Sequence, residues 1–250
     1  MTTTMKVIKL GGSLLDDAQR RAAALGEIAA AWNAGEKLVL IHGGGKHIDA
    51  MMARLGIAKR TCAGLRITDD ETLQIVVAVL GGIVNKMLVA ELTALGITAA
   101  GISGSDGGTL VAEQHPPIDG VELGNVGRVV HSNATVVNAL LRSGVLPVVS
   151  SIAQGPNGTL LNVNADSAAS ALAVGLKAHT LHFITDVAGL LDANGEVVRV
   201  LHPHLAEQFL ASEIVSGGMR PKLEAALVAL RLGVQSIAIG ENGGTNLVAA

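Results

Sequence analysis

The chain has 250 residues, of which 49% are hydrophobic and only 16% charged, a composition typical of a globular protein with a large buried core. The formal net charge of −3 and the scattered Lys and Arg residues disfavour a nucleic-acid partner, and the single cysteine, Cys62, excludes an intrachain disulfide. We find no secretory segment and no apolar stretch near the roughly 20 residues that cross a bilayer, so we expect a cytoplasmic protein without a membrane partner.

Short apolar runs alternate with longer helical patterns along the chain. The runs are continuously apolar, as strands buried on both faces should be, and predict strands at 6–10, 37–42, 97–102, 145–151, 180–185 and 236–240. Helices are predicted at 17–33, 45–55, 69–94, 133–143, 166–177, 202–211 and 220–233. Because strand and helix alternate, the sequence predicts an α/β fold with a parallel sheet and helices on both of its faces.

Three segments break this rhythm. Residues 59–68, 158–164 and 190–200 have the pattern of β-hairpins, the last with an Asn-Gly turn. Residues 113–120 are predicted as a surface loop. A ligand-binding lobe and a nucleotide lobe sharing one sheet would divide near residues 175–180.

Two glycine turns follow the first two predicted strands: Gly11-Gly12 in "KLGGS" and Gly43-Gly44-Gly45 in "HGGGK". Open parallel sheets bind ligands at these strand ends, where backbone amides can converge on an anion. The alternative is that the glycines only make tight turns. Neither turn has the spacing of the Rossmann or P-loop fingerprint, which disfavours a dinucleotide-dependent oxidoreductase.

Two lysines lie in unusual positions. Lys9 is inside the first apolar strand, where an unpaired ammonium is costly unless it faces an anion at the strand end. A lysine reaching solvent from an edge strand is the alternative. Lys222 lies in the first turn of a predicted helix, the positive end of the helix dipole. A lysine there is repelled by the helix dipole. A bound polyphosphate would make its positive charge favourable, whereas screening by solvent would make the repulsion trivial.

Further polar residues suggest a pocket. Asn162 and Asn164 alternate along a strand and share a face, and Asp166 begins the next helix, where a plain N-cap is the alternative role. Arg66 ends a hairpin and is suited to gripping a carboxylate, unless it is only a solvated surface residue. His42 is a candidate general base or a packed strand-end residue. No metal site is predicted at His202 and His204.

In chain order, the stretches "KLGGSLL", "IHGGGK", "AGLRIT", "LNVNADSAASALA", "TDVAGLL" and "SGGMRPK" closely resemble the N-acetylglutamate kinases of the amino acid kinase family. The resemblance covers residues 6 to about 240. It implies a three-layer αβα open sandwich around a mainly parallel sheet of about eight strands. An N-terminal lobe, 1–177, would bind the acyl amino acid, and a C-terminal lobe, 178–250, would bind ATP.

The resemblance also implies roles for individual residues. Lys9 and Lys222 would stabilise the transferring phosphoryl group, and Asp166 would orient both. Four residues would bind N-acetyl-L-glutamate: Gly44, Gly45, Arg66 and Asn162. Eleven would contact the nucleotide: Gly11, Gly12, Asp186, Val187, Ala188, Gly189, Leu190, Leu191, Ile214, Val215 and Ser216. Lys46 is expected to be a solvated residue of the following helix.

The implied activity is ATP-dependent phosphorylation of the γ-carboxylate of N-acetyl-L-glutamate in arginine biosynthesis, with Mg²⁺ present only in complex with ATP and no metal held by the protein. The first strand begins near residue 6, without the preceding helix of the arginine-inhibited, ring-forming members, so the resemblance implies a homodimer that arginine does not inhibit. Two alternatives are a sister kinase for carrier-bound aminoadipate or glutamate and a non-catalytic ligand sensor. The three residues Lys9, Asp166 and Lys222 argue against a sensor, which has no need of phosphoryl-transfer cations.

Overall fold

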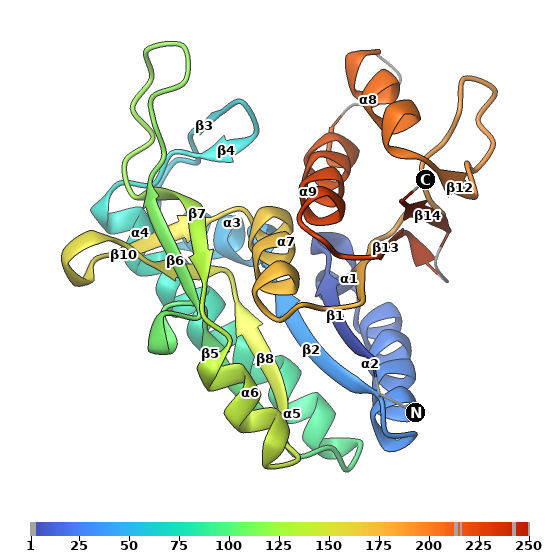
Figure 1. The fold of residues 1–250 in the computed structure, drawn as a ribbon. Coiled ribbons are helices and arrows are strands. Elements are labelled where there is room, and N and C mark those ends of the chain that lie inside the picture. The colour runs from blue at the N-terminus through green and yellow to red at the C-terminus, as the bar shows by residue number, and fades with distance from the viewer. Residues whose placement is uncertain (1–3, 213–214, 216, 242–243, 250) are drawn as a thin grey trace.

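An eight-stranded sheet forms the centre of the fold (Figure 1). The structure is a computed structural model that describes residues 4–212, 215, 217–241 and 244–249. The strand order is β12-β14-β13-β11-β1-β2-β8-β5, and the one antiparallel pair among these strands is β13 with β14. The predicted mainly parallel sheet of about eight strands is therefore confirmed. Its strands are β1 Met5–Leu10, β2 Lys37–His42, β5 Ala99–Ser103, β8 Leu146–Ser150, β11 Thr180–Ile184, β12 Val200–Leu201, β13 Ser236–Ile239 and β14 Thr245–Val248.

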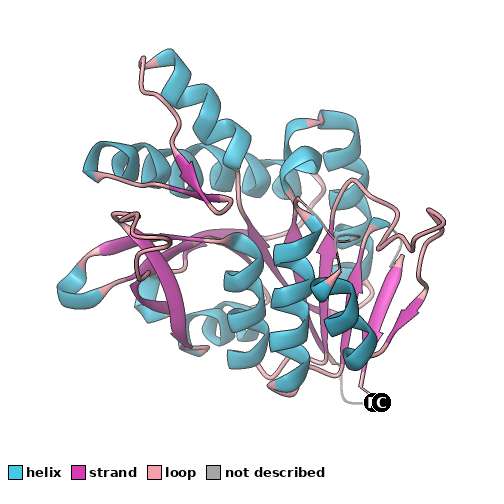
Figure 2. Ribbon diagram, turned by 90° about the horizontal axis from the view of Figure 1, so that it is seen from above, coloured by secondary structure: helices cyan, strands magenta, loops and turns pink. Residues whose placement is uncertain are grey.

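Helices cover both faces of this sheet, as the alternating pattern predicts (Figure 2). One face carries α6 to α9 and the other carries α1 to α5. Because successive strand residues point to opposite sides, each strand contributes side chains to both cores. In β1, Val7 packs under α7 while Ile8 and Leu10 join the opposite core. The helices are α1 Gly12–Asp16, α2 Ala18–Asn33, α3 Gly45–Arg54, α4 Asp70–Val77, α5 Asn85–Ala94, α6 Thr135–Arg142, α7 Ala165–Gly175, α8 Pro203–Ala211 and α9 Met219–Arg231.

The predicted helix at 69–94 is continuous but changes its winding in the middle. A π-helix, Ala78–Val84, joins α4 to α5. Contrary to the sequence expectation, the combined segment Asp70–Ala94 is long and apolar enough, by length and composition, to cross a membrane. Its buried side chains, Val76 and Leu88 among them, belong to the core on that face of the sheet.

Four further strands close into a small barrel, in the order β10-β7-β6-β9, which was not predicted in full. Its four strands are β6 Leu110–Gln114, β7 Val126–Ser132, β9 Ile152–Gln154 and β10 Leu160–Val163. The expected surface loop at 113–120 is thus partly wrong, since β6 extends to Gln114. The predicted hairpin at 158–164 supplies only β10, which pairs with the preceding β9 around the 3₁₀ turn Pro156–Gly158. A second 3₁₀ turn, Asp106–Gly108, precedes β6.

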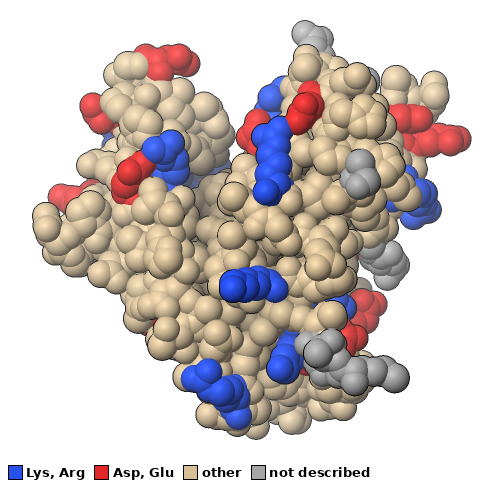
Figure 3. Space-filling model, viewed as in Figure 1, with Lys and Arg blue, Asp and Glu red and all other residues tan. Residues whose placement is uncertain are grey.

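The remaining predicted hairpins are present. Strands β3 Thr61–Cys62 and β4 Leu65–Arg66 pair antiparallel, and an antiparallel bridge joins Leu191 to Val197 in the segment before β12. In Figure 1 the β3–β4 and β6–β7 hairpins project on one side, and α8 and α9 rise on the other. The space-filling view shows that this face is hollowed between the two sides, with charges of both signs scattered over it (Figure 3).

Candidate active site

Lys9, Asp166 and Lys222 meet in one buried cluster, although they come from three separate elements. The Nζ atom of Lys9 in β1 lies 2.8 Å from Oδ1 of Asp166, at the start of α7. The Nζ atom of Lys222, at the start of α9, lies 3.3 Å from Oδ2 of the same carboxylate. The side chains of Lys9 and Asp166 are only 6% and 7% exposed. One carboxylate therefore holds two ammonium groups side by side.

The fold explains why these three side chains converge. Lys9 points to the same face of the sheet as Val7, which is the face that α7 and α9 cover. These two helices pack together, and the Ser170 hydroxyl in α7 donates to the Ala225 carbonyl in α9 (2.9 Å). The starts of both helices are thereby fixed above the carboxyl end of β1.

The surroundings of Asp166 and Lys222 shift the pKa of each group. Burial alone would raise the pKa of Asp166, but the charges of Lys9 and Lys222 outweigh burial and lower it. Burial lowers the pKa of Lys222, and the attraction of Asp166 only partly opposes this effect. The carboxylate is thus firmly ionised, and an additional anion beside the lysines would be stabilised.

Asn164, rather than Asp166, caps helix α7. Its Oδ1 atom accepts from the backbone N–H groups of Asp166 (2.9 Å) and Ser167 (3.1 Å). The alternative role considered for Asp166, a plain N-cap, is therefore wrong. Because the neighbouring asparagine satisfies the helix end, the Asp166 carboxylate remains available to the two lysines.

The four predicted acceptor-binding residues line one cavity of about 190 Å³: Gly44, Gly45, Arg66 and Asn162. Its walls come from the turn after β2, the β3–β4 hairpin, strand β10 and the start of α7. Asn164 and Ala165 also line it, so the cavity opens beside the helix start that carries Asp166. Side-chain amides and a guanidinium therefore line a space that reaches the residue before Asp166.

Arg66 is held in place before any ligand binds. Its side chain is 10% exposed, and its Nη2 atom donates to Oδ1 of Asp49 and to the carbonyl of Gly45 (3.2 Å). Asp49 also pairs with Lys59 (2.8 Å). The alternative of a freely solvated Arg66 is therefore wrong. Sequence reasoning missed Asp49, because an acidic residue within an amphipathic helix gives no signal that distinguishes it from an ordinary surface residue.

Asn162 joins a short polar relay. Its amide nitrogen donates to the buried Thr68 hydroxyl (3.1 Å), which donates to the carbonyl of Arg66 (2.8 Å). This relay ties β10 to the end of the β3–β4 hairpin. Two residues that are 96 positions apart in sequence are thereby fixed on the same cavity wall.

The first glycine turn contacts the end of β11. The Gly11 N–H donates to the Ile184 carbonyl (2.9 Å), and a Cβ atom on Gly11 would lie only 2.8 Å from that oxygen. Gly11 is therefore required by close backbone packing. A Cβ atom on Gly12 would meet nothing within 4 Å, so the structure itself gives no packing reason for this glycine.

The predicted nucleotide segment 186–191 follows β11 directly. Asp186, Val187 and Ala188 are exposed, and Leu190 is buried with its N–H donating to the Thr245 hydroxyl (2.7 Å). Gly189 is buried, and Leu191 is 47% exposed. Of the three remaining predicted residues, Val215 is buried, whereas Ile214 and Ser216 lie outside the described residues. Four of the six residues in segment 186–191 are therefore exposed.

Two further residues of the second glycine motif are His42 and Lys46, and the structure selects the packed strand-end role that was the alternative for His42. His42 is completely buried at the end of β2, which rules out direct contact with a substrate as a general base. Lys46 is 68% exposed, as expected of a solvated residue, yet its Nζ atom lies 3.2 Å from Oδ2 of Asp16.

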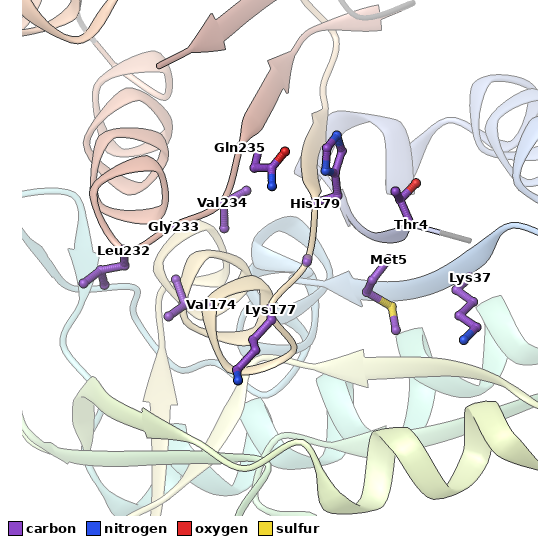
Figure 4. Close-up of a pocket in the computed structure, with 11 residues that line it drawn as sticks. Thr4, Met5, Lys37, Val174, Lys177, His179, Leu232, Gly233, Val234 and Gln235 are labelled. Atoms are coloured by element: carbon purple, nitrogen blue, oxygen red, sulfur yellow. The ribbon is translucent and has the colours of Figure 1, made fainter. Parts of the chain in front are cut away.

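A larger cavity of about 670 Å³ lies at the opposite, amino ends of the strands (Figure 4). Thr4, Met5, Lys37, His179 and Gln235 are among the residues that line it. None of the predicted site residues does. The larger cavity therefore lacks the buried charges that mark the candidate site.

Comparisons with known proteins show the family and the fold of the chain. The sequence model described as "Amino acid kinase family" matches residues 4–241. The acetylglutamate kinase of Methanopyrus kandleri is 43% identical over 241 residues, which cover 94% of each chain. That of Rhizobium leguminosarum bv. trifolii is 38% identical over 242 residues, covering 93% of this chain and 82% of its own. The solved structure of smu.665 from Streptococcus mutans UA159 superposes with a TM-score of 0.88 at 30% identity, covering 98% of this chain and 99% of its own.

Proposed function

The chain belongs to the amino acid kinase family, and from this premise we propose that it transfers the γ-phosphoryl group of ATP to the γ-carboxylate of N-acetyl-L-glutamate. The products are ADP and N-acetyl-L-glutamyl 5-phosphate, an acyl phosphate of arginine biosynthesis. One observation carries the proposal: the buried Lys9–Asp166–Lys222 cluster adjoins a cavity lined by Arg66 and Asn162.

This phosphoryl transfer requires stabilisation of negative charge rather than a general base. A γ-carboxylate oxygen attacks the γ-phosphorus, and the bond from that phosphorus to the β–γ bridging oxygen breaks, leaving the electron pair on ADP. The nucleophile carries no proton, so none has to be removed. Alignment and neutralisation of the phosphoryl oxygens then account for catalysis. Lys9 and Lys222 supply the positive charge, and Asp166 keeps their ammonium groups in register.

The acceptor fits the cavity by its functional groups. Arg66 would pair with a carboxylate of N-acetyl-L-glutamate, and the Asn162 side chain would contribute a further polar contact. The amides of Gly44 and Gly45 would face the acceptor from the turn after β2. The relatives named acetylglutamate kinase support this small acceptor over a carrier-bound one.

ATP would bind on the open side of the cluster. Gly11 and Gly12 would face the β- and γ-phosphates, and segment 186–191 would line the nucleotide together with residues 214–216. Among the described residues, no group of three or more His, Cys, Asp or Glu side chains is gathered for a metal ion. We propose that Mg²⁺ enters with ATP as part of the nucleotide complex.

We also propose how the chain is divided into lobes and how it assembles. Residues 1–177 would form the acceptor lobe and residues 178–250 the nucleotide lobe of one kinase domain. We propose a cytoplasmic homodimer that binds neither nucleic acid nor membrane. Gel filtration with light scattering should give a dimer, and a hexamer would contradict this part of the proposal.

The activity is tested by ATP-dependent hydroxamate formation with N-acetyl-L-glutamate, glutamate, aspartate and carbamate compared side by side. The acetylated acceptor should give the highest kcat/KM, because the cavity offers it both a cation and amide partners. Absence of turnover with N-acetyl-L-glutamate, or faster turnover of another acceptor, would reject the proposed substrate.

A further inference from the structure

His42 is the most deeply buried titratable residue near the acceptor cavity, and the phosphoryl-transfer chemistry does not use it. It ends β2, between β1 and β8 in the sheet, and it is 0% exposed. Burial lowers the pKa of His42 to about 4, so the ring is neutral at physiological pH. A buried neutral imidazole that never meets substrate requires another explanation.

The ring has two partners, and they define a single tautomer. Nδ1 lies 2.8 Å from the carbonyl oxygen of Gly43, which can only accept, so Nδ1 carries the proton. Nε2 lies 3.1 Å from the side-chain nitrogen of Asn85, which can only donate. That amide nitrogen also donates to the Val148 carbonyl (2.9 Å), while the Asn85 oxygen accepts from Lys86 (3.1 Å). Protonation of Nε2 would place two donors face to face.

The bond to Gly43 determines the direction of the next amide. No cis peptide occurs among the described residues, and in a trans peptide the carbonyl and the following N–H point in opposite directions. Because the Gly43 carbonyl is turned toward the buried ring, the Gly44 N–H is turned away from it. Gly43, Gly44 and Gly45 all line the acceptor cavity.

The same turn also packs against the π-helix. A Cβ atom on Gly44 would lie 2.8 Å from Cδ2 of Leu80 and 3.2 Å from Cγ2 of Val84, so the turn is pressed against residues 78–84. Asn85 follows that π-helix directly, and it is 0% exposed. The partner that selects the His42 tautomer thus comes from the segment against which the glycine turn packs.

We propose that His42 is a positioning residue that directs the Gly44 amide toward the carboxylate of the acceptor, with Asn85 fixing the tautomer that this requires. The inference rests on the proposed kinase function and adds a residue to it. Substrate recognition by the glycine turn then depends on a hydrogen bond behind the cavity. A small displacement of a binding group can lower activity by as much as about 10²-fold, so loss of this bond should be measurable in acceptor KM.

Three substitutions separate positioning from bulk packing. In His42→Asn the side-chain amide lies near the place of Nδ1 and can still donate to Gly43, whereas in His42→Gln it lies near the place of Nε2 and cannot. His42→Gln should raise KM for N-acetyl-L-glutamate by roughly tenfold or more while KM for ATP stays unchanged, and His42→Asn should recover much of the loss. His182→Asn is the matched control, because it removes a histidine-to-carbonyl bond (Nε2 to Gly240, 3.0 Å) on the nucleotide side, and it should leave acceptor KM unchanged.

The outcomes distinguish this inference from the proposed function. No turnover by the wild-type chain would reject the kinase proposal itself. An active wild type whose His42→Gln variant keeps a normal acceptor KM would overturn the positioning role. The positioning role would also be overturned if Tm, kcat and both KM values worsened together and His42→Asn were no better than His42→Gln.

A measurement on the unaltered protein covers the case in which the variants do not fold. Nitrogen-15 NMR of the wild type should show the Nδ1–H tautomer of His42 without titration between pH 5 and pH 9, consistent with a pKa of about 4. Adding N-acetyl-L-glutamate should shift the Gly44 amide resonance. An Nε2–H tautomer, a titration near pH 6.5, or an unshifted Gly44 amide at saturating acceptor would contradict the inference.

Discussion

The two sides of the Lys9–Asp166–Lys222 cluster are built differently. On the acceptor side, Arg66 and Asn162 are already hydrogen-bonded and face a defined cavity. On the nucleotide side, segment 186–191 is largely exposed and no packing contact meets a side chain at Gly12. The proposed acceptor side is therefore part of the protein's folded framework, whereas the described residues of the proposed nucleotide side are more exposed.

Substitutions on the two sides should therefore differ in their effects on KM and on stability. On the acceptor side a change removes internal hydrogen bonds as well as substrate contacts, so KM and stability should change together. On the nucleotide side, a change at an exposed position such as Gly12 can alter ATP binding without lowering stability. Residues of the cluster itself belong to both sides and should affect kcat.

The largest effect is expected from removing either lysine. Lys9→Ala and Lys222→Ala should each lower kcat by about 10²- to 10³-fold, the usual loss for one electrostatic stabiliser of a transition state. Lys9→Ala should also lower Tm more than Lys222→Ala, because the Lys9 ion pair is the more deeply buried. Saturation kinetics and thermal unfolding measure both quantities. If both variants kept near-normal kcat, the assigned roles would be wrong.

The next effect tests the preformed acceptor side. Arg66→Ala should raise KM for N-acetyl-L-glutamate about 10- to 100-fold, because a hydrogen bond to a charged group contributes about 1.5–3 kcal/mol. KM for ATP should stay the same, while Tm falls because Asp49 loses a partner. Arg231→Ala is the control, since this exposed arginine in α9 pairs only with the exposed Glu207. A rise in KM for ATP equal to that for the acceptor would contradict the division between the two sides.

A smaller effect tests the open nucleotide side. In Gly12→Ala the added methyl group meets no protein atom within 4 Å, so Tm should not fall. If Gly12 faces the phosphates, the methyl group will displace them, and KM for ATP should rise by roughly the tenfold that corresponds to 1.4 kcal/mol. Gly26→Ala in the interior of α2, which is equally free of contacts, should leave KM for ATP unchanged and should not lower Tm, because alanine is the better helix former. An unaltered KM for ATP in Gly12→Ala would remove this glycine from the phosphate site.

The smallest effect concerns pH. Burial lowers the pKa of Lys222, and only the protonated side chain stabilises phosphate, so kcat/KM for ATP should fall as pH rises, beginning below the range of an ordinary lysine. Lys222→Arg should move this alkaline limb to higher pH, because a guanidinium stays charged. The profile is measured from pH 7 to pH 10.5. An identical limb in both proteins would assign the titration to another group.

Local sequence pattern was sufficient to predict six strands of the large sheet and most of the helices beside it, whereas β12, β14 and α1 were not predicted from the pattern. Continuous apolar runs such as 37–42 are buried on both faces wherever they lie in a parallel sheet, so their pattern alone identifies them. Strands β6 and β7 were missed because they have exposed positions and are joined by a polar, proline-containing loop. The π-helix at 78–84 leaves the apolar pattern of 69–94 unaltered and so gave no signal.

The site residues were named from motifs, but their partners required the fold. Nothing near Arg66 in sequence identifies Asp49 as the residue that holds it, and His42 and Asn85 are 43 positions apart. Their pairing depends on which helix covers which strand. The distinction between Asn164 as cap and Asp166 as lysine partner likewise depends on side-chain geometry.

The most direct test of the whole account is a crystal structure with N-acetyl-L-glutamate and a non-hydrolysable ATP analogue bound. The account predicts the acceptor in the cavity with Arg66 and Asn162, and the γ-phosphate beside the Nζ atoms of Lys9 and Lys222. Either ligand found instead in the cavity at the amino ends of the strands, with the lysine cluster left uncontacted, would contradict it.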